Sequence, residues 1–217
     1  MAAVPHGDRH ALRRLIEERL KDSRPPTDPG SALPAGFAAD VGGAVRQFFP
    51  AAPAAAAVLI PIVDREDGLS VLLTQRAIHL KNHAGQVSFP GGRIESGDAG
   101  PLAAALRETE EEIGLSREHV TFAGYLDPQL VLTGYWVTPV VGFVQPGFEL
   151  KLDRREVDAT FEVPLTHILD AANHQSRERM LGNTKVLVYD IPYREHRIWG
   201  ATAGMLMALY RLLRTST

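Results

Sequence analysis

Short apolar runs, which are typical of β-strands, place the strongest constraint on the fold of this chain. Residues 56–63 and 69–75 are apolar or alternating runs, and the charged segment between them ends in Gly68, which predicts two strands joined by a tight loop. Further strands are expected at 86–89, 120–126, 136–144 and 185–191. Because these strands do not alternate regularly with helices, we expect an α/β fold whose sheet is mixed and flanked by a few helices.

Four segments carry helix signals. Asp8 can cap a helix that extends to Lys21, with apolar residues at helical spacing on one face. The acidic segment 102–112 predicts a second helix, which Gly114 ends. A short helix near 165–172 and a last helix over 201–213 complete the set.

The domain organisation follows from length and proline content. Segment 23–36 carries four prolines and two glycines, which break regular structure and favour an extended connector. A chain of 217 residues with 45% hydrophobic content can bury the core of one compact domain. We therefore expect residues 1–50 to form an N-terminal helix and connector, and residues 51–217 to form the main domain.

Composition excludes several classes of function. A net charge of -3 indicates neither a nucleic-acid-binding nor a membrane-binding surface, and no apolar run reaches the ~18 residues of a membrane span. The N-terminus has no apolar core of a signal peptide. The absence of cysteine excludes disulfides and thiolate metal sites and fits a reducing compartment, so we expect a cytoplasmic protein.

The acidic helix separates into two faces. Successive helical residues advance by about 100°, so Glu108, Glu111 and Glu112 share one face. The opposite, apolar face is expected in the core and holds Leu102, Ala105, Leu106, Thr109 and Ile113. Carboxylates at these spacings repel one another by a few tenths of a kcal/mol per pair, which a hard divalent cation such as Mg²⁺ would reverse. Spacing alone also allows a solvated acidic face.

Two neighbours of this helix add to the pattern. Arg107 lies four residues before Glu111 and can brace its carboxylate. The turn at Gly91 and Gly92 follows a short strand and leads through Asp98 into the helix. Glycines let backbone N–H groups approach a phosphate closely, although a tight turn with positive φ is the simpler interpretation of an isolated pair.

Together these residues resemble the Nudix box, G-x5-E-x7-R-E-U-x-E-E-x-G-U, where U is aliphatic. The matching positions are Gly92, Asp98, Arg107, Glu108, Glu111, Glu112, Gly114 and Leu115. The chain departs from the pattern in three ways: Asp98 replaces glutamate, eight residues rather than seven separate it from Arg107, and Thr109 occupies an aliphatic position.

A second motif lies just upstream. Residues 72–77, Lys81, Gly85 and 89–92 are similar to L-L-T-x-R-[SA]-x3-R-x3-G-x3-F-P-G-G, the motif of the coenzyme A diphosphatase branch of Nudix hydrolases. Only Lys81 departs from it, as another cation in place of arginine. The two motifs cover about a fifth of the chain.

The resemblance implies the Nudix fold, a mixed β-sheet sandwiched between helices, and a substrate of coenzyme A or acyl-CoA. Cleavage of its diphosphate bond gives adenosine 3',5'-bisphosphate and (acyl) 4'-phosphopantetheine. The resemblance implies Mg²⁺ or Mn²⁺ as cofactor, with Glu108 and Glu112 as the first ligands and Glu111 as a third ligand or water activator. Arg107 is expected to orient these carboxylates. The general base stays open between Glu111 and a later carboxylate, for which charge alone allows Glu149, Glu156 or Asp158.

Substrate contacts are expected on both sides of the short strand 86–89. Arg76 and Lys81 match the upstream motif and offer charge for the 3'-phosphate, and Gly91 and Gly92 are expected to contact the diphosphate. His79 and His83 are more simply solvent-facing. The aromatic residues that could stack on adenine are more simply core residues: Tyr125, Tyr135, Trp136 and Trp199.

Two other functions remain open. One is a Nudix hydrolase of ADP-ribose, a dinucleotide or a nucleoside triphosphate, and the other is a non-catalytic Nudix domain that senses a nucleotide. The intact glutamates argue against the second. The sequence leaves the acyl preference and the oligomeric state open, with a homodimer among the options.

Overall fold

The computed structural model describes residues 8–27, 33–34, 36–37, 45 and 47–214. Its helices are α1 (Arg9–Leu20), α2 (Pro101–Ile113), α3 (Leu165–Leu169) and α4 (Gly200–Arg214), with 3-10 turns η3 (Arg117–His119) and η4 (Ala171–Asn173). Its strands are β1 (Leu33–Pro34), β2 (Ala54–Arg65), β3 (Gly68–Arg76), β4 (Val87–Ser88), β5 (Gly91–Arg93), β6 (Val120–Tyr125), β7 (Gln129–Val131), β8 (Tyr135–Val144), β9 (Val157–Pro164), β10 (Gln175–Leu181), β11 (Thr184–Tyr193) and β12 (His196–Trp199).

The main sheet is mixed, as the sequence predicts. Its strand order is β1-β7-β8-β2-β3-β4, with β5 paired to β2, β6 to β8 and β9 to β3. The central pair β2 and β8 is parallel and runs in register from Ala54–Tyr135 to Val63–Val144. The predicted hairpin is the antiparallel pair of β2 and β3. The long apolar runs become the buried centre of the sheet because both of its faces are covered.

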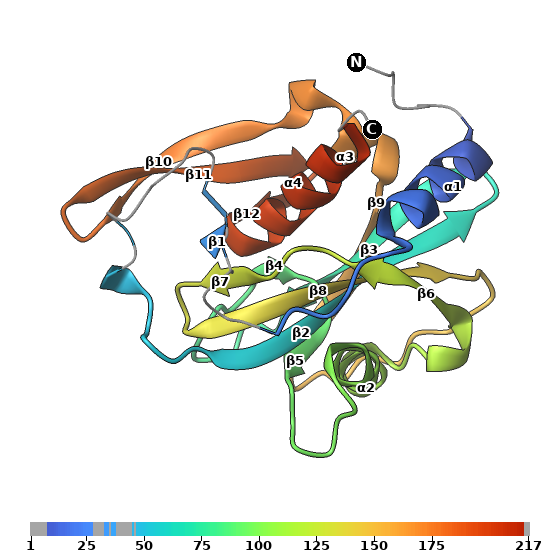
Figure 1. Ribbon diagram of the computed structural model, residues 1–217, viewed down its shortest axis with the longest axis horizontal. Coiled ribbons are helices and arrows are strands. Elements are labelled where there is room, and N and C mark those ends of the chain that lie inside the picture. Colours follow the sequence, from blue (N-terminus) through green and yellow to red (C-terminus); the bar gives the residue numbers. More distant parts are fainter. Residues whose placement is uncertain (1–7, 28–32, 35, 38–44, 46, 215–217) are drawn as a thin grey trace.

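Figure 1 shows this sheet between two layers of helices, with α2 on one side and α1, α3 and α4 on the other. Helix α2 packs against β2, β5 and β8, and α1 packs against β6 and α4. The predicted sandwich is therefore confirmed. Among the described residues, no helix is long and apolar enough to cross a membrane.

Helix α1 begins as its cap predicts. The side chain of Asp8 accepts hydrogen bonds from the backbone N–H groups of His10 and Ala11. Leu12, Ile16 and Leu20 are buried in the same core cluster as side chains of the sheet and α4. Part of the proline-rich connector, residues 28–32 and 35, lies outside the described residues, and β1 pairs with β7.

A second sheet, β10-β11-β12, is antiparallel and packs against α4. Only the segment of β11 was predicted from the sequence, because β10 is exposed along nearly its whole length and has no apolar face. Backbone pairing and a buried charge hold it instead. Asp190 of β11 is fully buried and forms ion pairs with Arg177 of β10 and Arg197 of β12.

Strand β9 was also not predicted. Its residues are mostly half-buried, so the apolar alternation that identifies a strand is weak. It pairs with β3, and it brings Glu162 beside Arg65 and Ser70 of the hairpin.

Candidate active site

Helix α2 has a clear beginning and end. Gly100 stands at its N-cap without a side-chain hydrogen bond, and Pro101 is the first helical residue, where a missing N–H costs nothing. Gly114 ends the helix in the left-handed conformation, with φ 69°, and its N–H donates to the Glu110 carbonyl. The predicted helix is thus confirmed to within one residue at each end.

The two faces of α2 are as predicted except at one position. Ala104, Ala105, Thr109 and Ile113 are buried. Leu102 and Leu106 are half-buried at the edge of this face. Glu112, however, is only 4% exposed, whereas the side chain of Glu111 is 59% exposed. The three glutamates, which were predicted to share one face of the helix, therefore lie in different environments.

The glycine pair contacts two of these glutamates directly. Gly91 and Gly92 belong to β5, which pairs with β2. The Gly91 N–H donates to the Glu112 carboxylate at 3.2 Å. A Cβ atom at Gly92 would lie 2.4 Å from the Glu108 carboxyl carbon, and one at Gly91 would lie 2.4 Å from the Ala57 carbonyl oxygen. Gly91, with φ 151° and backbone atoms beside it, therefore requires glycine, whereas a side chain at Gly92 would displace the Glu108 carboxylate.

This geometry corrects the expected role of the Gly-Gly turn. The segment between the pair and α2 runs through residues 94–100, which include Asp98, as predicted. The Gly91 N–H is directed at Glu112 instead of standing free for a phosphate. Gly91 and Gly92 therefore hold the glutamates close to the sheet.

Burial makes the Glu112 carboxylate unfavourable without a cation. Desolvation raises its pKa to about 8; the Gly91 hydrogen bond and Arg76 oppose this shift, and the charges of Glu156 and Glu108 reinforce it. Desolvation also raises the pKa of Glu108, and Arg107 opposes that shift. Oxygen ligands and excess negative charge fit a hard divalent cation, which would restore the ionised form of Glu112.

Arg107 holds two of the glutamates in the structure. Its Nη1 donates to Glu108 at 3.0 Å and to Glu111 at 3.1 Å, so the expected contact with Glu111 is confirmed. Its Nε and Nη2 form a two-pronged bond to Asp98 at 3.1 and 3.0 Å. Asp98 thus holds the Arg107 side chain in place, and the Arg107 guanidinium lowers the pKa of the Asp98 carboxyl.

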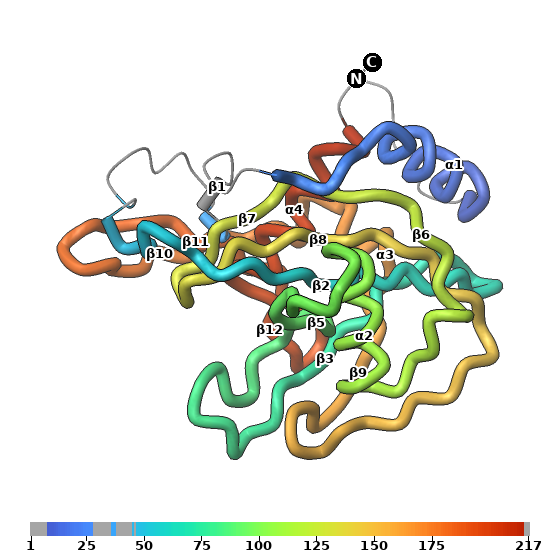
Figure 2. Tube along the Cα trace, turned by 60° about the horizontal axis from the view of Figure 1, so that its bottom comes forward, coloured from blue at the N-terminus to red at the C-terminus, as the bar shows by residue number. Residues whose placement is uncertain are grey.

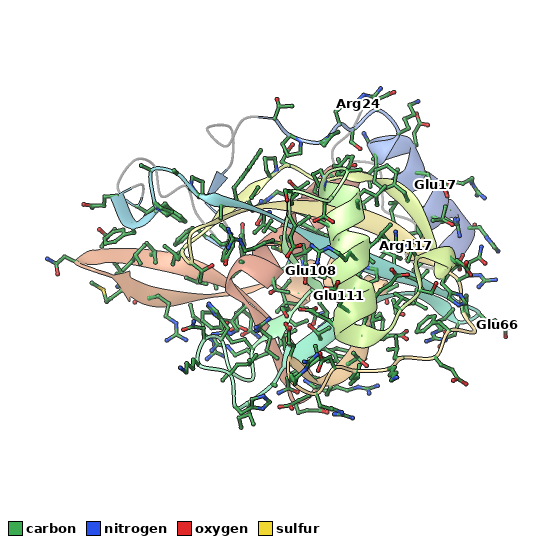
Figure 3. The ribbon with its side chains drawn as sticks, turned by 90° about the horizontal axis from the view of Figure 1, so that it is seen from below. Glu17, Arg24, Glu66, Glu108, Glu111 and Arg117 are labelled. Atoms are coloured by element: carbon green, nitrogen blue, oxygen red, sulfur yellow. The ribbon has the colours of Figure 1, made fainter. Side chains whose placement is uncertain are left out.

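The acidic side chains do not gather around one point in this structure. Within the described part of the chain, no three acidic or histidine side chains lie close enough to ligate one ion. Glu111 turns to Arg107 and solvent, while Glu108 and Glu112 lie against the glycine pair. Figure 3 views the molecule from the side of α2, with Glu108 and Glu111 labelled.

The loop between β8 and β9 adds a carboxylate that the sequence could not single out. It closes around the end of α2, where the N–H groups of Lys151 and Asp153 donate to the carbonyls of Ile113 and Glu112. The same loop brings Glu156 close enough for its charge to raise the pKa of both Glu108 and Glu112.

The two other later carboxylates have different positions. Asp158 accepts a hydrogen bond from the Ile78 N–H, and Glu149 is exposed. Of the three carboxylates that charge alone allowed, Glu156 is the one whose charge raises the pKa of both the half-buried Glu108 and the buried Glu112.

Arg76 and Lys81 have different positions. Arg76 ends β3, and its charge opposes the rise in the pKa of Glu112. Its Nε is buried and has no hydrogen-bond partner among the described residues. Lys81 is exposed in the loop between β3 and β4. Figure 2 shows that this loop and the β8–β9 loop project from the same side of the molecule, and the Ala77 N–H bonds the Glu156 carbonyl between them.

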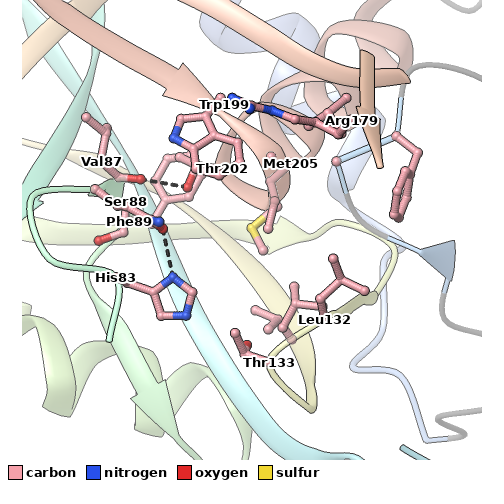
Figure 4. Close-up of a pocket in the computed structure, with 18 of the residues that line it drawn as sticks. His83, Val87, Ser88, Phe89, Leu132, Thr133, Arg179, Trp199, Thr202 and Met205 are labelled. Carbon is pink, nitrogen blue, oxygen red and sulfur yellow. Dashed lines mark hydrogen bonds between the residues drawn. The ribbon is translucent and has the colours of Figure 1, made fainter. Parts of the chain in front are cut away.

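A cavity of about 400 Å³ lies beside the glycine pair and is shown in Figure 4. Arg76 and Phe89 line it on the side of the glutamates, and Trp199 and Met205 line it on the side of α4. The expectation that Trp199 is a core residue is therefore incomplete, because its ring also faces this cavity. Val87, Ser88 and Thr202 complete the wall between β4 and α4.

Comparisons with known proteins agree with this architecture. The model of the NUDIX domain family matches residues 53–182. The uncharacterized Nudix hydrolase NudL of Escherichia coli K12 is 44% identical over 155 residues, which are 71% of this chain and 80% of that protein.

Solved structures are less similar. A MutT/nudix family protein from Enterococcus faecalis is 17% identical, with a TM-score of 0.46, over 74% of this chain and 62% of that one. The Ap4A hydrolase of C. elegans in a binary complex is 21% identical, with a TM-score of 0.45, over 51% of this chain and 80% of that one. Nudix hydrolases generally need divalent ions such as Mg²⁺ or Mn²⁺. From the family match and the similarity to NudL, the chain belongs to the Nudix family and is an enzyme that hydrolyses phosphorus-containing anhydrides.

Proposed function

We propose that this enzyme hydrolyses the diphosphate bond of coenzyme A or acyl-CoA with Mg²⁺ or Mn²⁺, giving adenosine 3',5'-bisphosphate and (acyl) 4'-phosphopantetheine. The observation that carries the proposal is the contact of Glu108 and Glu112 with the Gly91–Gly92 pair, where the two motifs meet. The resemblance of the upstream motif favours coenzyme A over other Nudix substrates, and its Arg76 lines the cavity while its charge acts on Glu112.

Glu108 and Glu112 hold the divalent ion in this proposal. When bound, the ion would supply positive charge that reduces the repulsion between the diphosphate oxygens and an attacking nucleophile. Glu111 can join these ligands only if its hydrogen bond with Arg107 breaks, so we rank it below Glu108 and Glu112 as a direct ligand. Arg107 fixes the direction of Glu108 while Asp98 fixes Arg107.

Glu156 is the proposed general base. It lies on a loop rather than on α2, and its charge raises the pKa of both Glu108 and Glu112. Because Glu156 is not one of the proposed metal ligands, it could take the proton of an attacking water while Glu108 and Glu112 hold the ion. Glu111 is the alternative, but its carboxylate is already bonded to Arg107.

Arg76 is the proposed partner of a substrate phosphate. A buried guanidinium nitrogen without a partner is costly, and a phosphate oxygen can satisfy it. Lys81 is proposed for the 3'-phosphate by resemblance, and its exposed loop position leaves it available to a large substrate.

A substrate panel tests this function. The values of kcat/KM are measured with Mg²⁺ and with Mn²⁺ for coenzyme A, dephospho-coenzyme A, ADP-ribose, a dinucleoside polyphosphate and a nucleoside triphosphate. We expect the highest value for coenzyme A and a lower one for dephospho-coenzyme A. A higher value for ADP-ribose or a triphosphate would establish the rival Nudix activity, and binding without turnover of any of them would establish a sensing domain.

A further inference from the structure

We propose that the cavity between β4 and α4 binds the acyl chain at the end of the substrate's pantetheine arm, so that the enzyme prefers acyl-CoA to free coenzyme A. This inference rests on the proposed function and deepens it. It starts from the position of the cavity, which shares its lining residues Arg76, Val58 and Phe89 with the surroundings of the glycine pair. Val58 lies directly against Gly91, where an added Cβ would be 2.5 Å from the Val58 Cα. A substrate whose diphosphate lies at the glutamates can therefore extend into this cavity.

The inner wall of the cavity is apolar. Its buried side chains include Phe89, Val137, Val186 and Met205, each less than 9% exposed. Figure 4 shows the Met205 side chain pointing into the space between Trp199 and Leu132. Transfer of an aliphatic chain from water into such a wall is favourable in proportion to the apolar area that it buries.

Three polar side chains on the β4 side of the cavity, those of Thr202, Ser88 and His83, already have partners within the protein. The Thr202 hydroxyl donates to the Val87 carbonyl, and the Ser88 hydroxyl is bonded to that of Thr74. His83 Nδ1 is bonded to the Gln86 side chain. Beside β4, the polar edge of an adenine base would lose its bonds to water without gaining partners from these three side chains, whereas an alkyl chain needs none. The lining therefore favours the acyl end of the substrate over the adenine end.

The cation contacts of Trp199 also favour an acyl chain over an adenine base in this cavity. The guanidinium groups of Arg179 and Arg197 lie over its ring, at 5.7 and 5.4 Å from the centroid. An adenine base that stacked on this indole would compete with them. The edge of the ring can instead pack against an aliphatic chain.

The mouth of the cavity carries apolar side chains in contact with solvent. Leu132 is 47% exposed and Met180 is 65% exposed, and both line the cavity. Exposed apolar groups at the rim of an apolar cavity are typical of a ligand-binding site. Methionine has the flexibility to adapt to chains of different length.

Much of this wall lies outside the part that the family shares. The NUDIX match ends at residue 182, whereas Val186, Val188, Trp199 and Met205 come from β11, β12 and α4. A cavity that is built on the shared catalytic layer but walled by segments beyond it is suited to substrate selection.

The test is a chain-length series with the full-length enzyme. The values of kcat/KM are measured for coenzyme A and for its acetyl, butanoyl, octanoyl and palmitoyl thioesters. We expect kcat/KM to rise by up to about fourfold for each methylene group that becomes buried, and to stop rising once the cavity is full. Equal values for free coenzyme A and all thioesters would overturn the assignment.

Two matched variants locate the effect. Met180→Asp places a charge at the mouth, and we expect it to lower the ratio of kcat/KM for octanoyl-CoA over coenzyme A by about tenfold or more. Leu187→Asp is the control, because Leu187 is also exposed on this small sheet but does not line the cavity. An unchanged ratio in Met180→Asp, or an equal loss in Leu187→Asp, would contradict the assignment.

A binding measurement separates this inference from the activity on which it rests. Calorimetry in EDTA compares octanoyl-CoA with coenzyme A, since the cavity does not depend on a metal ion. Tighter binding of octanoyl-CoA without cleavage of any thioester in Mg²⁺ or Mn²⁺ would refute the proposed activity and support the cavity. Cleavage of coenzyme A together with equal binding of both ligands would support the activity and refute the cavity.

Discussion

The two sides of the sheet near the glycine pair differ in character: the side of α2 is acidic, and the side of α4 is largely apolar. On the side of α2, carboxylates are gathered at a cost: Glu112 is buried with a raised pKa, and Arg107 holds Glu108 and Glu111. On the side of α4, a cavity has a largely apolar inner wall, and the hydroxyls of Thr202 and Ser88 are paired within the protein. The first arrangement stores unfavourable charge that a cation can relieve, and the second selects a ligand by shape and apolar area. We infer that chemistry and selectivity are divided between these two layers.

The largest expected effect comes from Glu112→Gln, which removes a proposed metal ligand from the charged layer. We expect kcat to fall by on the order of 10³ or more, with little change in fold, because a neutral amide cannot replace the charge of the carboxylate. Glu110→Gln is the control, since Glu110 is on the same helix but pairs with Arg117. A normal kcat in Glu112→Gln would remove this residue from the site.

The next effect is a dependence of stability on pH in EDTA. The pKa of Glu112 is about 8 in the folded, metal-free protein, above its ordinary value of 4.5. The folded state therefore binds its proton more tightly than the unfolded state, so stability is highest below pH 4.5 as far as this group is concerned. It falls as pH rises toward 8, by a few kcal/mol.

Thermal melts in EDTA and in Mg²⁺ between pH 5 and pH 9 measure this dependence. We expect Mg²⁺ to raise the Tm more at pH 8 than at pH 5, and the difference to shrink in Glu112→Gln. A Mg²⁺ effect that is equal at both pH values would show that the ion does not relieve this carboxylate.

Glu156→Gln tests whether the β8–β9 loop supplies the base. We expect kcat to fall on the order of 10²-fold and activity to depend less on pH. The reason is that the variant has no general base at this position to accept the proton of the attacking water. Glu149→Gln, on the same loop, is the control. If Glu156→Gln kept both its kcat and its pH profile, Glu111 would become the better candidate.

Gly92→Ala tests the close approach of the sheet to the helix. The added methyl would lie 2.4 Å from the Glu108 carboxyl carbon, so that carboxylate must move, and we expect kcat to fall on the order of 10-fold. Gly97→Ala, whose Cβ meets nothing within 4 Å, should keep wild-type activity. Equal activity of the two variants would show that the position of Glu108 is not critical.

The smallest effect on kcat is expected from Asp190→Asn, which lies in the cavity layer but outside the cavity. Loss of this buried charge weakens the ion pairs with Arg177 and Arg197 across the small sheet, and we expect a loss of about 2 kcal/mol in the free energy of unfolding. The value of kcat for coenzyme A should stay within about twofold. Denaturant unfolding and steady-state kinetics measure the two quantities, and a large loss of kcat would show that the layers are coupled.

The same two layers differ in how much of them the sequence predicts. The acidic helix, its end at Gly114 and the hairpin are predicted because their patterns are local. The separate environments of Glu111 and Glu112 are not, because burial depends on β5 and on the β8–β9 loop, which are distant in sequence. The proximity of Glu156 has the same cause.

The cavity layer has almost no local signal. Strand β10 is held by pairing with β11 and by Asp190 rather than by an apolar face of its own, so periodicity cannot find it. The cavity joins side chains from β4, β7, β11 and α4, and no motif links those segments. Spacing therefore predicts the chemistry of this chain better than its selectivity.

The most direct test of the central claim is product analysis by mass spectrometry after incubation with coenzyme A and Mg²⁺ or Mn²⁺. We predict equal amounts of adenosine 3',5'-bisphosphate and 4'-phosphopantetheine, formed by the wild-type and Glu110→Gln enzymes and lost in EDTA and in Glu112→Gln. Intact coenzyme A after incubation with an enzyme that cleaves ADP-ribose, or products that form equally in EDTA, would contradict the account.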